Sequence, residues 1–383
     1  FAAATAAAVA QEPGTTSDIE PAGEMLVPRM MHTATLLEDG RVLVVGGLDM
    51  EGTEVGSAEI WDPATRRFAP AGSLIQPRTD HVVSRLADGR VLITGGAVRQ
   101  DPEGIRPDQE GPFPLASAEL WDPTSGAFES TGSLVIARHG HTSTALADGR
   151  ALIVGGTMGS TPLAEIWDPD AAVFEPAEPP VVERIYGHTA TLLDDGRVLI
   201  AGGRDTSFTD LASVELWDPG TGEFELAGSL GLGRILHTAT RLADGRVLIV
   251  GGSGVNEDGM QDLFGAALVW DPESGELVEA GPLAIGRAMH QVSALPDGRA
   301  LVIGGIGFTD EAARADPEVG PSVLADVEFF DAAGGTFEPA GRLSAGRMGH
   351  TATTLPDGRV LVIGGSDETG QVIGAAEAWA PSP

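Results

Sequence analysis

The sequence contains no cysteine and no lysine, and it has only one asparagine and one tyrosine, Asn256 and Tyr186. Without cysteine the chain forms no disulfide and has no thiolate for metal binding or nucleophilic attack. Its 23 basic residues are all arginines and stand against 56 acidic residues, which gives a formal net charge of −33. Because such a surface repels phosphate, the composition predicts no nucleic-acid partner and no binding to anionic membranes.

Long apolar runs are also missing, since none reaches the roughly 18 residues that a membrane span needs. The 53 glycines and 26 prolines, spread along the whole chain, argue against a helical bundle. The first residues, "FAAATAAAVAQEPG", carry small side chains at Ala8 and Ala10 and resemble the end of a secretory signal. We therefore expect residues 1–18 to be an N-terminal arm or export remnant, and the protein to be secreted and extracellular.

What the sequence does have is a repeat, first seen as "RMMHTATLLEDGRVLVVGG" at residues 29–47. In each of seven copies a histidine lies 14 residues before the first glycine of a Gly-Gly pair, and these histidines are His32, His81, His141, His188, His237, His290 and His350. A second block, such as "SAEIWDPATRRF" at residues 57–68, follows each of the first six pairs.

Each repeat predicts four short antiparallel strands. "HTATLL" alternates polar and apolar residues and leads into an Asp-Gly turn, which is typical of a two-residue hairpin. "VLVV" is apolar on both faces and predicts a strand buried on both sides. "AEIWDP" and "FAPAGSL" supply a third and a fourth strand, and four-stranded sheets repeated radially form a propeller.

The aliphatic run, the Gly-Gly pair and the later aromatic residue resemble the kelch repeat, whose period is near 50. The resemblance implies an all-β, seven-bladed propeller over residues 19–383, with blades starting near residues 32, 81, 141, 188, 237, 290 and 350. Residues 19–31 are expected to supply the outer strand of the last blade and its connection, because Ile19 precedes His32 by 13 residues just as Phe337 precedes His350. That closure would leave no open edge.

The arginine and histidine of the repeat are interpreted as structural, together with residues of the first blade, Arg29, His32, Gly46, Gly47, Glu59 and Trp61. Each arginine is expected to pair with a glutamate of the third strand, except in blade five, where Leu268 stands instead. The alternative is a ring of imidazoles that takes a metal ion or an anion.

Variable loops are the alternative place for function, because long loops on a rigid scaffold commonly carry it. The loops between the second and third strands are long in blades two and six, and there we predict partner-binding residues, namely Arg99, Asp101, Glu103, Arg106, Asp108, Phe113, Phe308, Asp310, Glu311 and Arg314. The loop of blade five holds a possible calcium site formed by Asn256, Asp258 and Asp262, although the twelve-residue calcium-loop pattern is incomplete.

Among kelch propellers are copper enzymes of the galactose oxidase type, whose radical site uses tyrosines, histidines and a Tyr-Cys crosslink. With no cysteine and Tyr186 alone, this chain cannot assemble that site. No other catalytic motif stands out from the repeat, so the sequence predicts a non-catalytic propeller without cofactor that binds a protein or glycan partner. The alternatives are a structural subunit that self-assembles into an oligomer, fibre or array through the N-terminal arm, and a carbohydrate-active enzyme without a copper radical.

Overall fold

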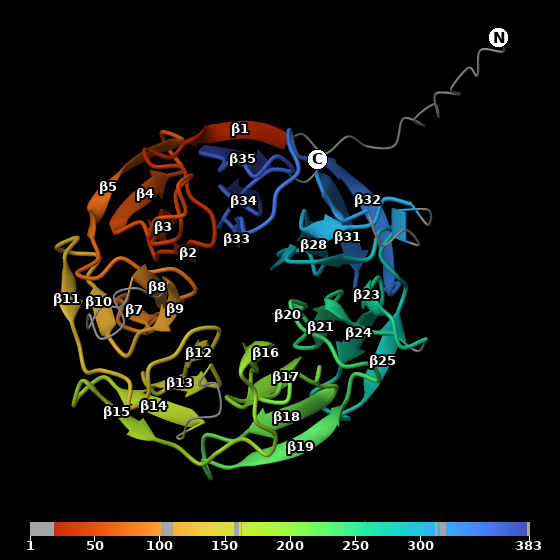
Figure 1. The fold of residues 1–383 in the computed structure, drawn as a ribbon, viewed down its shortest axis with the longest axis horizontal. Coiled ribbons are helices and arrows are strands. Elements are labelled where there is room, and N and C mark those ends of the chain that lie inside the picture. The colour runs from red at the N-terminus through yellow and green to blue at the C-terminus, as the bar shows by residue number, and fades with distance from the viewer. Residues whose placement is uncertain are drawn as a thin grey trace.

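The computed structural model describes residues 19–100, 110–156, 161, 163–256, 258–310, 313–314 and 319–380. In these residues the chain forms seven four-stranded antiparallel sheets. Figure 1 shows the sheets following one another around a ring, with their first strands toward the axis and their fourth strands outside. The all-β class and the four-stranded antiparallel units predicted from the repeat are confirmed. The described part of the chain has no helix long and apolar enough to cross a membrane.

The sheets are numbered here in chain order. Sheet one consists of β2 (Thr33–Leu36), β3 (Val42–Val45), β4 (Ser57–Asp62) and β5 (Arg67–Ser73). Sheet two consists of β6 (Val82–Arg85), β7 (Val91–Thr94), β10 (Ala118–Trp121) and β11 (Phe128–Ser130). Sheet three consists of β12 (Thr142–Ala145), β13 (Ala151–Val154), β14 (Ala164–Asp168) and β15 (Val173–Pro176). Sheet four consists of β16 (Tyr186–Leu192), β17 (Val198–Arg204), β18 (Ser213–Trp217) and β19 (Phe224–Ser229).

The remaining sheets follow the same order. Sheet five consists of β20 (Thr238–Arg241), β21 (Val247–Val250), β24 (Ala267–Trp270) and β25 (Leu277–Ala280). Sheet six consists of β27 (Gln291–Ala294), β28 (Ala300–Ile303), β31 (Asp326–Asp331) and β32 (Thr336–Arg342). Sheet seven consists of β33 (Thr351–Thr354), β34 (Val360–Ile363), β35 (Ala375–Trp379) and the N-terminal β1 (Ile19–Glu24).

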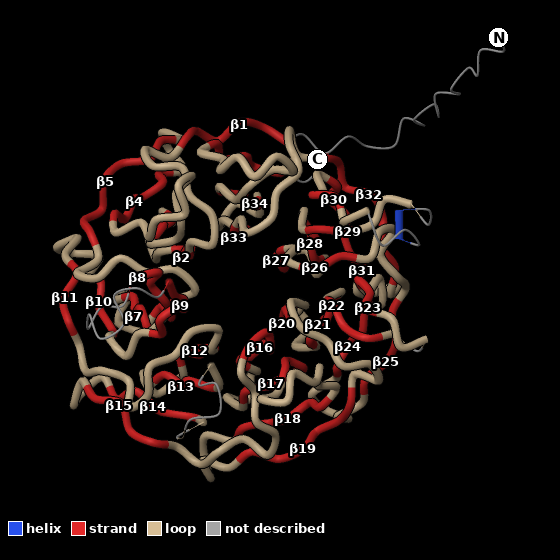
Figure 2. Tube along the Cα trace, viewed as in Figure 1, coloured by secondary structure: helices blue, strands red, loops and turns tan. Residues whose placement is uncertain are grey.

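Short extra strands lie in the loops between second and third strands. Sheet two carries β8 (Ala97–Gln100) paired with β9 (Glu110–Pro114), and sheet five carries β22 (Ser253–Val255) paired with β23 (Gln261–Leu263). Near sheet six, β26 (Arg287–Ala288), β29 (Ile306–Gly307) and β30 (Ser322–Val323) form a third small sheet. Figure 2 shows how much of the chain around these strands is loop.

The first hairpin of the repeat differs from the expected two-residue turn. β2 ends at Leu36 and β3 begins at Val42, and within this loop Gly40 donates its N–H to the carbonyl of Leu37 at 3.1 Å. Gly40 has a φ of 83°, whereas Asp39 is not in the left-handed region. The loop is therefore a longer turn that ends in one left-handed glycine.

The N-terminal strand completes the last sheet. β1 pairs with β35 in antiparallel register, with Ile19 opposite Trp379 and Pro21 opposite Glu377. First strands of neighbouring sheets contact one another all the way round, including β2 with β33. The two ends of the chain are thus held in one sheet (Figure 1).

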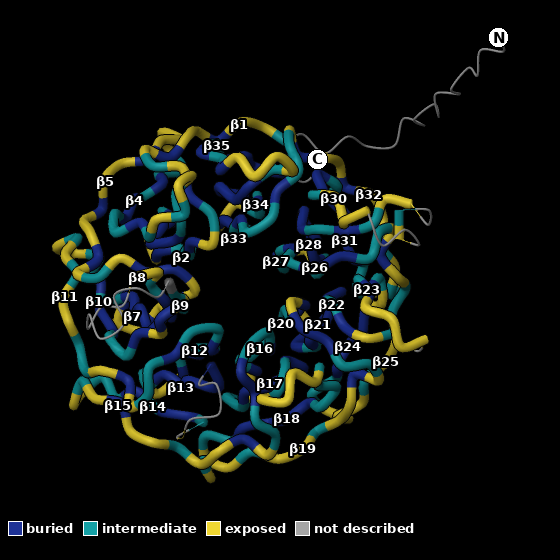
Figure 3. The backbone as a smooth tube through the Cα atoms, viewed as in Figure 1, coloured by how far each residue is buried: buried dark blue, intermediate teal, exposed yellow. Residues whose placement is uncertain are grey.

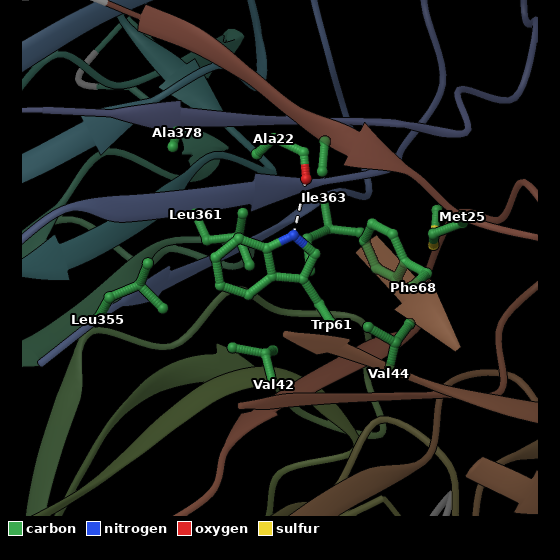
Figure 4. Close-up of a cluster of buried hydrophobic side chains, with 11 residues drawn as sticks. Ala22, Met25, Val42, Val44, Trp61, Phe68, Leu355, Leu361, Ile363 and Ala378 are labelled. Carbon is green, nitrogen blue, oxygen red and sulfur yellow. Dashed lines mark hydrogen bonds between the residues drawn. The ribbon is translucent and has the colours of Figure 1, made fainter. Parts of the chain in front are cut away.

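The hydrophobic core consists of separate clusters, each packed between two neighbouring sheets. The buried residues in Figure 3 are therefore distributed around the ring and do not form one central core. Between sheets one and seven, Trp61 is fully buried and packs with Leu361 and Ile363 of β34 (Figure 4). Its Nε1 donates to the carbonyl of Ala22 on β1 at 2.7 Å, across the boundary between the two sheets. The tryptophan therefore helps to fix the N-terminal strand in place.

Candidate functional site

A buried arginine precedes the first strand of every sheet. In sheet one the fully buried Arg29 donates from Nη2 to Glu59 Oε1, at 2.7 Å. Glu59 also accepts the backbone N–H groups of Leu26 and Val27, at 2.7 and 3.1 Å. The pair thus fastens the connection that enters the sheet to the third strand of that sheet. The equivalent ion pairs are Arg78–Glu119, Arg138–Glu165, Arg184–Glu215, Arg287–Glu328 and Arg347–Glu377.

In six of the seven sheets the repeated histidine hydrogen-bonds a threonine of the preceding sheet. Nε2 of His81 in sheet two lies 3.0 Å from Oγ1 of Thr33 in sheet one, and Nε2 of His32 lies 3.0 Å from Oγ1 of Thr351 in sheet seven. Burial lowers the pKa of five of the seven imidazoles to about 3, those of His32, His81, His188, His237 and His350. These rings are therefore neutral packing elements at ordinary pH. Within the described ranges, no three His, Asp or Glu side chains are grouped so that they hold a metal ion.

The predicted partner-binding residues lie on separate loops. Five of them, Asp101, Glu103, Arg106, Asp108 and Glu311, fall outside the described residues. Phe113 on β9 is buried, with 6% of its surface exposed, so it belongs to the packing of its hairpin. Arg99 lies at the top of sheet two, where its N–H donates to Glu54 Oε1 at 2.7 Å.

The other residues of that set lie at sheet six. Phe308 is half-buried and Asp310 is exposed, with its Oδ1 accepting the N–H of Ala313 at 2.7 Å. Arg314 forms an ion pair with the buried Asp262 of sheet five. The structure brings Arg314 together with the predicted calcium site and leaves it apart from Arg99.

The three calcium candidates are already engaged with protein groups or turned apart. Asn256 Oδ1 accepts the N–H groups of Asp258 and Met260, at 3.0 and 2.9 Å, so it closes a turn. Asp262 is bound by Arg314 and accepts from Asn256 Nδ2 at 3.4 Å. The cation that this carboxylate faces is therefore a guanidinium.

One position at the inner start of the first strands carries a charged residue in a single sheet. The residue just before the repeated histidine is left-handed in every sheet, and the seven residues are Met31, Asp80, Gly140, Gly187, Leu236, Met289 and Gly349. Asp80 is the one charged member of this set, in an otherwise apolar or glycine series. Sheet two therefore differs from the other six sheets in carrying a carboxylate side chain at this position.

Asp80 interacts electrostatically with His139, the one histidine outside the repeat. The Asp80 side chain still reaches solvent, but the surrounding protein removes enough hydration to raise the pKa of its carboxyl, while the nearby His139 acts in the opposite direction. His139 precedes Gly140, and a Cβ on Gly140 would lie 2.9 Å from Cβ of Tyr186. Tyr186 therefore packs directly against the residue next to His139.

Tyr186 is itself held by an ion pair. Its hydroxyl accepts a hydrogen bond from Arg204 Nη1 at 2.8 Å, and Arg204 Nε donates to Asp210 Oδ1 at 2.6 Å. The hydrogen bond to Asp210 is the main reason that the pKa of Arg204 is raised. We call Asp80, His139, Tyr186, Arg204 and Asp210 the axial cluster. It combines a carboxyl, an imidazole and a phenol at the starts of three successive sheets.

The sequence carried a signal for this cluster that the repeat comparison missed. The arginine and the histidine are three positions apart in six repeats, but Arg184 and His188 are four apart. The extra residue extends the first hairpin of sheet four, so that β16 begins at Tyr186 and pairs it with Arg204 on β17. The single tyrosine of the chain is thus the insertion itself.

Comparisons with known proteins give a structural match. No family model and no curated protein matches the chain, so the kelch family is not confirmed. A solved structure of a fungal alcohol oxidase of the AA5 family, in complex with copper, matches with a TM-score of 0.71 and 19% identity. The match covers 97% of this chain and 77% of that one. At this identity the likeness shows the fold.

The residues of this chain do not fit a copper centre of the type expected for such an oxidase. Tyr186 is the single tyrosine, and its hydroxyl is bound by Arg204. The buried repeat histidines face threonines of neighbouring sheets, as His81 faces Thr33. In the described part of the chain there is no cluster of His, Asp and Glu for a metal. We therefore derive no step through copper.

The comparison nevertheless corrects the functional prediction. The sequence predicted a non-catalytic scaffold and no enzyme, and both predictions are contradicted by this finding, because a solved structure that matches 97% of this chain is that of an alcohol oxidase. The sequence interpretation assigned the seven repeated arginines and histidines to the scaffold and gave no catalytic role to His139 or Tyr186, which lie outside the repeat.

Proposed function

We propose that this chain is an enzyme that transfers protons on a small hydroxylated molecule, most simply a carbohydrate, at the axial cluster. The observation that carries the proposal is the position of Tyr186, the inserted and only tyrosine, against the residue that follows His139. A carboxyl of raised pKa, Asp80, interacts electrostatically with that histidine. Catalytic acids and bases gather in this manner at sites whose pKa values are perturbed.

The chemistry of each side chain suggests its role. Because Arg204 donates to the Tyr186 oxygen, the phenol proton is free to be donated to a substrate oxygen. His139 is the base that accepts a proton from a carbon or hydroxyl of the substrate, and Asp80 supports the cationic imidazole that results. Arg204, fixed by Asp210, positions the phenol. In an epimerisation beside a carbonyl, a C–H proton is removed and returned on the opposite face; in a β-elimination, His139 removes that proton while the C–O bond breaks and Tyr186 protonates the leaving oxygen.

We interpret the ring as a seven-bladed β-propeller of the kelch type that occupies residues 19–383 as one domain. Support comes from the Gly-Gly repeats and from the N-terminal strand in the last sheet. Export of the protein to the extracellular space follows from the signal-like N-terminal sequence and stays a prediction. Self-association and a protein or glycan partner also stay predictions from composition and loop length.

The test is turnover of a panel of mono- and oligosaccharides by the purified full chain, with a chelator present, scored for epimerisation, elimination, hydrolysis and oxidation. Proton-transfer groups contribute roughly 100-fold or more to a rate, so Tyr186→Phe and His139→Asn should each lower turnover at least that far. Met30→Leu is the matched control for His139, because each residue directly follows the repeated arginine of its sheet, and it should keep full activity. Absence of any turnover across the panel, or equal turnover by Tyr186→Phe, contradicts the proposal.

A further inference from the structure

Sheet five departs from the other six around its buried arginine, Arg234. Leu268 replaces the third-strand glutamate of the repeat, and Ala266 stands where sheets one, two and four have a serine that hydrogen-bonds the arginine, as Ser57 does in sheet one. The arginine itself is retained. A charged side chain has therefore kept its place while both polar side-chain partners became apolar.

The guanidinium of Arg234 consequently has one unused edge. Nη1 donates to the carbonyls of Gly251 and Ala266, at 3.0 and 3.5 Å. Nε is buried with no hydrogen-bond partner, and Nη2 makes no hydrogen bond to any described residue. In sheet three the corresponding edge of Arg138 donates to Glu165 Oε1 from both Nε and Nη2, at 2.9 and 2.6 Å.

Burial makes this unused edge costly. Arg234 has 2% of its surface exposed, and burial without a carboxylate lowers its pKa to about 10. An isolated buried charge is strongly unfavourable unless a counter-charge or hydrogen bonds compensate it. Arg234 has the largest exposed fraction of the seven repeat arginines, 2%, against 1% for Arg347 and none for the other five.

A third change at the same place adds an aromatic wall. Phe264 takes the position that Val55 holds in sheet one and Leu115 in sheet two, since each donates its N–H to the carbonyl of the second glycine of its pair. The Arg234 Cζ lies 5.1 Å from the centroid of the Phe264 ring. The ring faces the cation without supplying a negative charge.

We propose that Arg234, with Phe264 and Leu268, binds the carboxylate group of an external small molecule in the place of the missing glutamate. Six sheets of the same molecule place a glutamate carboxylate against this arginine, bound through Nη2 in five of them and through Nη1 in sheet four. Two parallel N–H donors match a carboxylate in bidentate geometry. The apolar neighbours suit a monocarboxylate with a short aliphatic tail. This site is separate from the axial cluster and does not depend on the proposed reaction.

The experiment measures binding of acetate and propionate to the full chain by calorimetry at constant ionic strength. Acetamide, which has the same shape without charge, and chloride are the comparison solutes. We expect one molecule of monocarboxylate per chain, with acetamide not binding and chloride binding at least roughly tenfold more weakly. No carboxylate binding, or chloride binding equal to that of acetate, overturns the assignment.

Leu268→Glu is the decisive variant, because it supplies the carboxylate from within the sheet. It should weaken acetate binding by about tenfold or more, and acetate should no longer raise its melting temperature. Leu268→Met keeps an apolar side chain of similar size at this position and should still bind acetate. If Leu268→Glu binds acetate as tightly as the unmodified chain, the carboxylate lies elsewhere and the proposal is wrong.

Discussion

At the scale of single residues, the first glycine of each Gly-Gly pair lies against the imidazole of the next sheet, where a side chain on the glycine would collide with the ring. A Cβ on Gly46 would lie 2.4 Å from Cε1 of His81 and 2.8 Å from the carbonyl oxygen of Arg78. Gly46 also has a φ of 65°, which disfavours any other residue. A glycine is therefore required at this position for two independent reasons, the contact with the histidine and the left-handed backbone.

Those two reasons separate in a matched pair of substitutions. Gly46→Ala should lower the free energy of unfolding by about 3–4 kcal/mol, because the methyl group displaces His81 and the left-handed backbone is strained. Gly126→Ala, at a φ of 69° with nothing within 4 Å of the new Cβ, should cost about 1–2 kcal/mol from backbone strain alone. Urea unfolding of both variants measures the difference. Equal losses would mean that the contact with His81 does not matter.

A buried glutamate gives a second prediction at this scale. Glu165 accepts hydrogen bonds from Arg138 and from the N–H groups of Val135 and Ile136, at 2.7 and 3.4 Å for the latter two. Glu165→Leu leaves the fully buried Arg138 in the situation of Arg234 but without its aromatic neighbour. We expect a loss of about 3–5 kcal/mol in unfolding free energy. The double variant with Arg138→Met should recover part of this loss, and no recovery would show that the cost comes from packing.

At the scale of strands and sheets, β1 holds the two ends of the chain together. It covers the edge of β35, and Ala22 within it and Met25 just after it belong to the hydrophobic cluster around Trp61. A chain that starts at residue 19 should fold, because it keeps the whole strand. A chain that starts at residue 25 should melt at a lower temperature and aggregate, because the edge of β35 is then open. Calorimetry and light scattering on both chains test this, and equal melting would show that β1 does not close the ring.

Much of this scale was predictable from the sequence, for identifiable reasons. The alternation in "HTATLL" and the doubly buried "VLVV" predicted β2 and β3, and the equal spacing of 13 residues predicted the placement of β1. The two-residue turn was wrong, because an Asp-Gly pair also fits a longer loop in which only Gly40 is left-handed.

The axial cluster was not predicted. Its residues come from three different repeats, and their proximity depends on how the sheets are placed around the axis. The one sign of the site in the sequence is the one-residue insertion at Tyr186, between Arg184 and His188. The repeat was recognised from the constant spacing between histidine and glycine, which this insertion does not alter.

At the scale of the whole molecule, the ring of buried imidazoles makes stability depend on pH. Each of the five pKa values near 3 is far below the value of 6.5 that the side chain has when exposed, and His141 and His290 are also lowered. Below pH 6.5 the unfolded chain binds protons that the folded chain does not bind. This contribution is therefore complete above pH 6.5 and is lost as the pH falls toward 3.

The expected slope is about 1.4 kcal/mol per pH unit for each histidine, so seven acting together outweigh the relief of repulsion as the −33 charge is neutralised. Unfolding free energies measured between pH 7.5 and 4.5 at high salt, where surface repulsion is screened, should fall steeply. A flat or rising profile over this interval would show that the imidazoles are not buried in neutral form.

The central claim is that the axial cluster binds and transforms a small hydroxylated molecule, and the single tyrosine allows it to be tested at one atom. Chain labelled with ¹³C-tyrosine gives signals from Tyr186 alone, and these can be followed as members of the saccharide panel are added. A saccharide that the protein turns over should shift the Tyr186 signal at saturating concentration, and His139→Asn should abolish turnover. A Tyr186 signal that no saccharide moves, or turnover by a saccharide that leaves the signal unchanged, would contradict the claim.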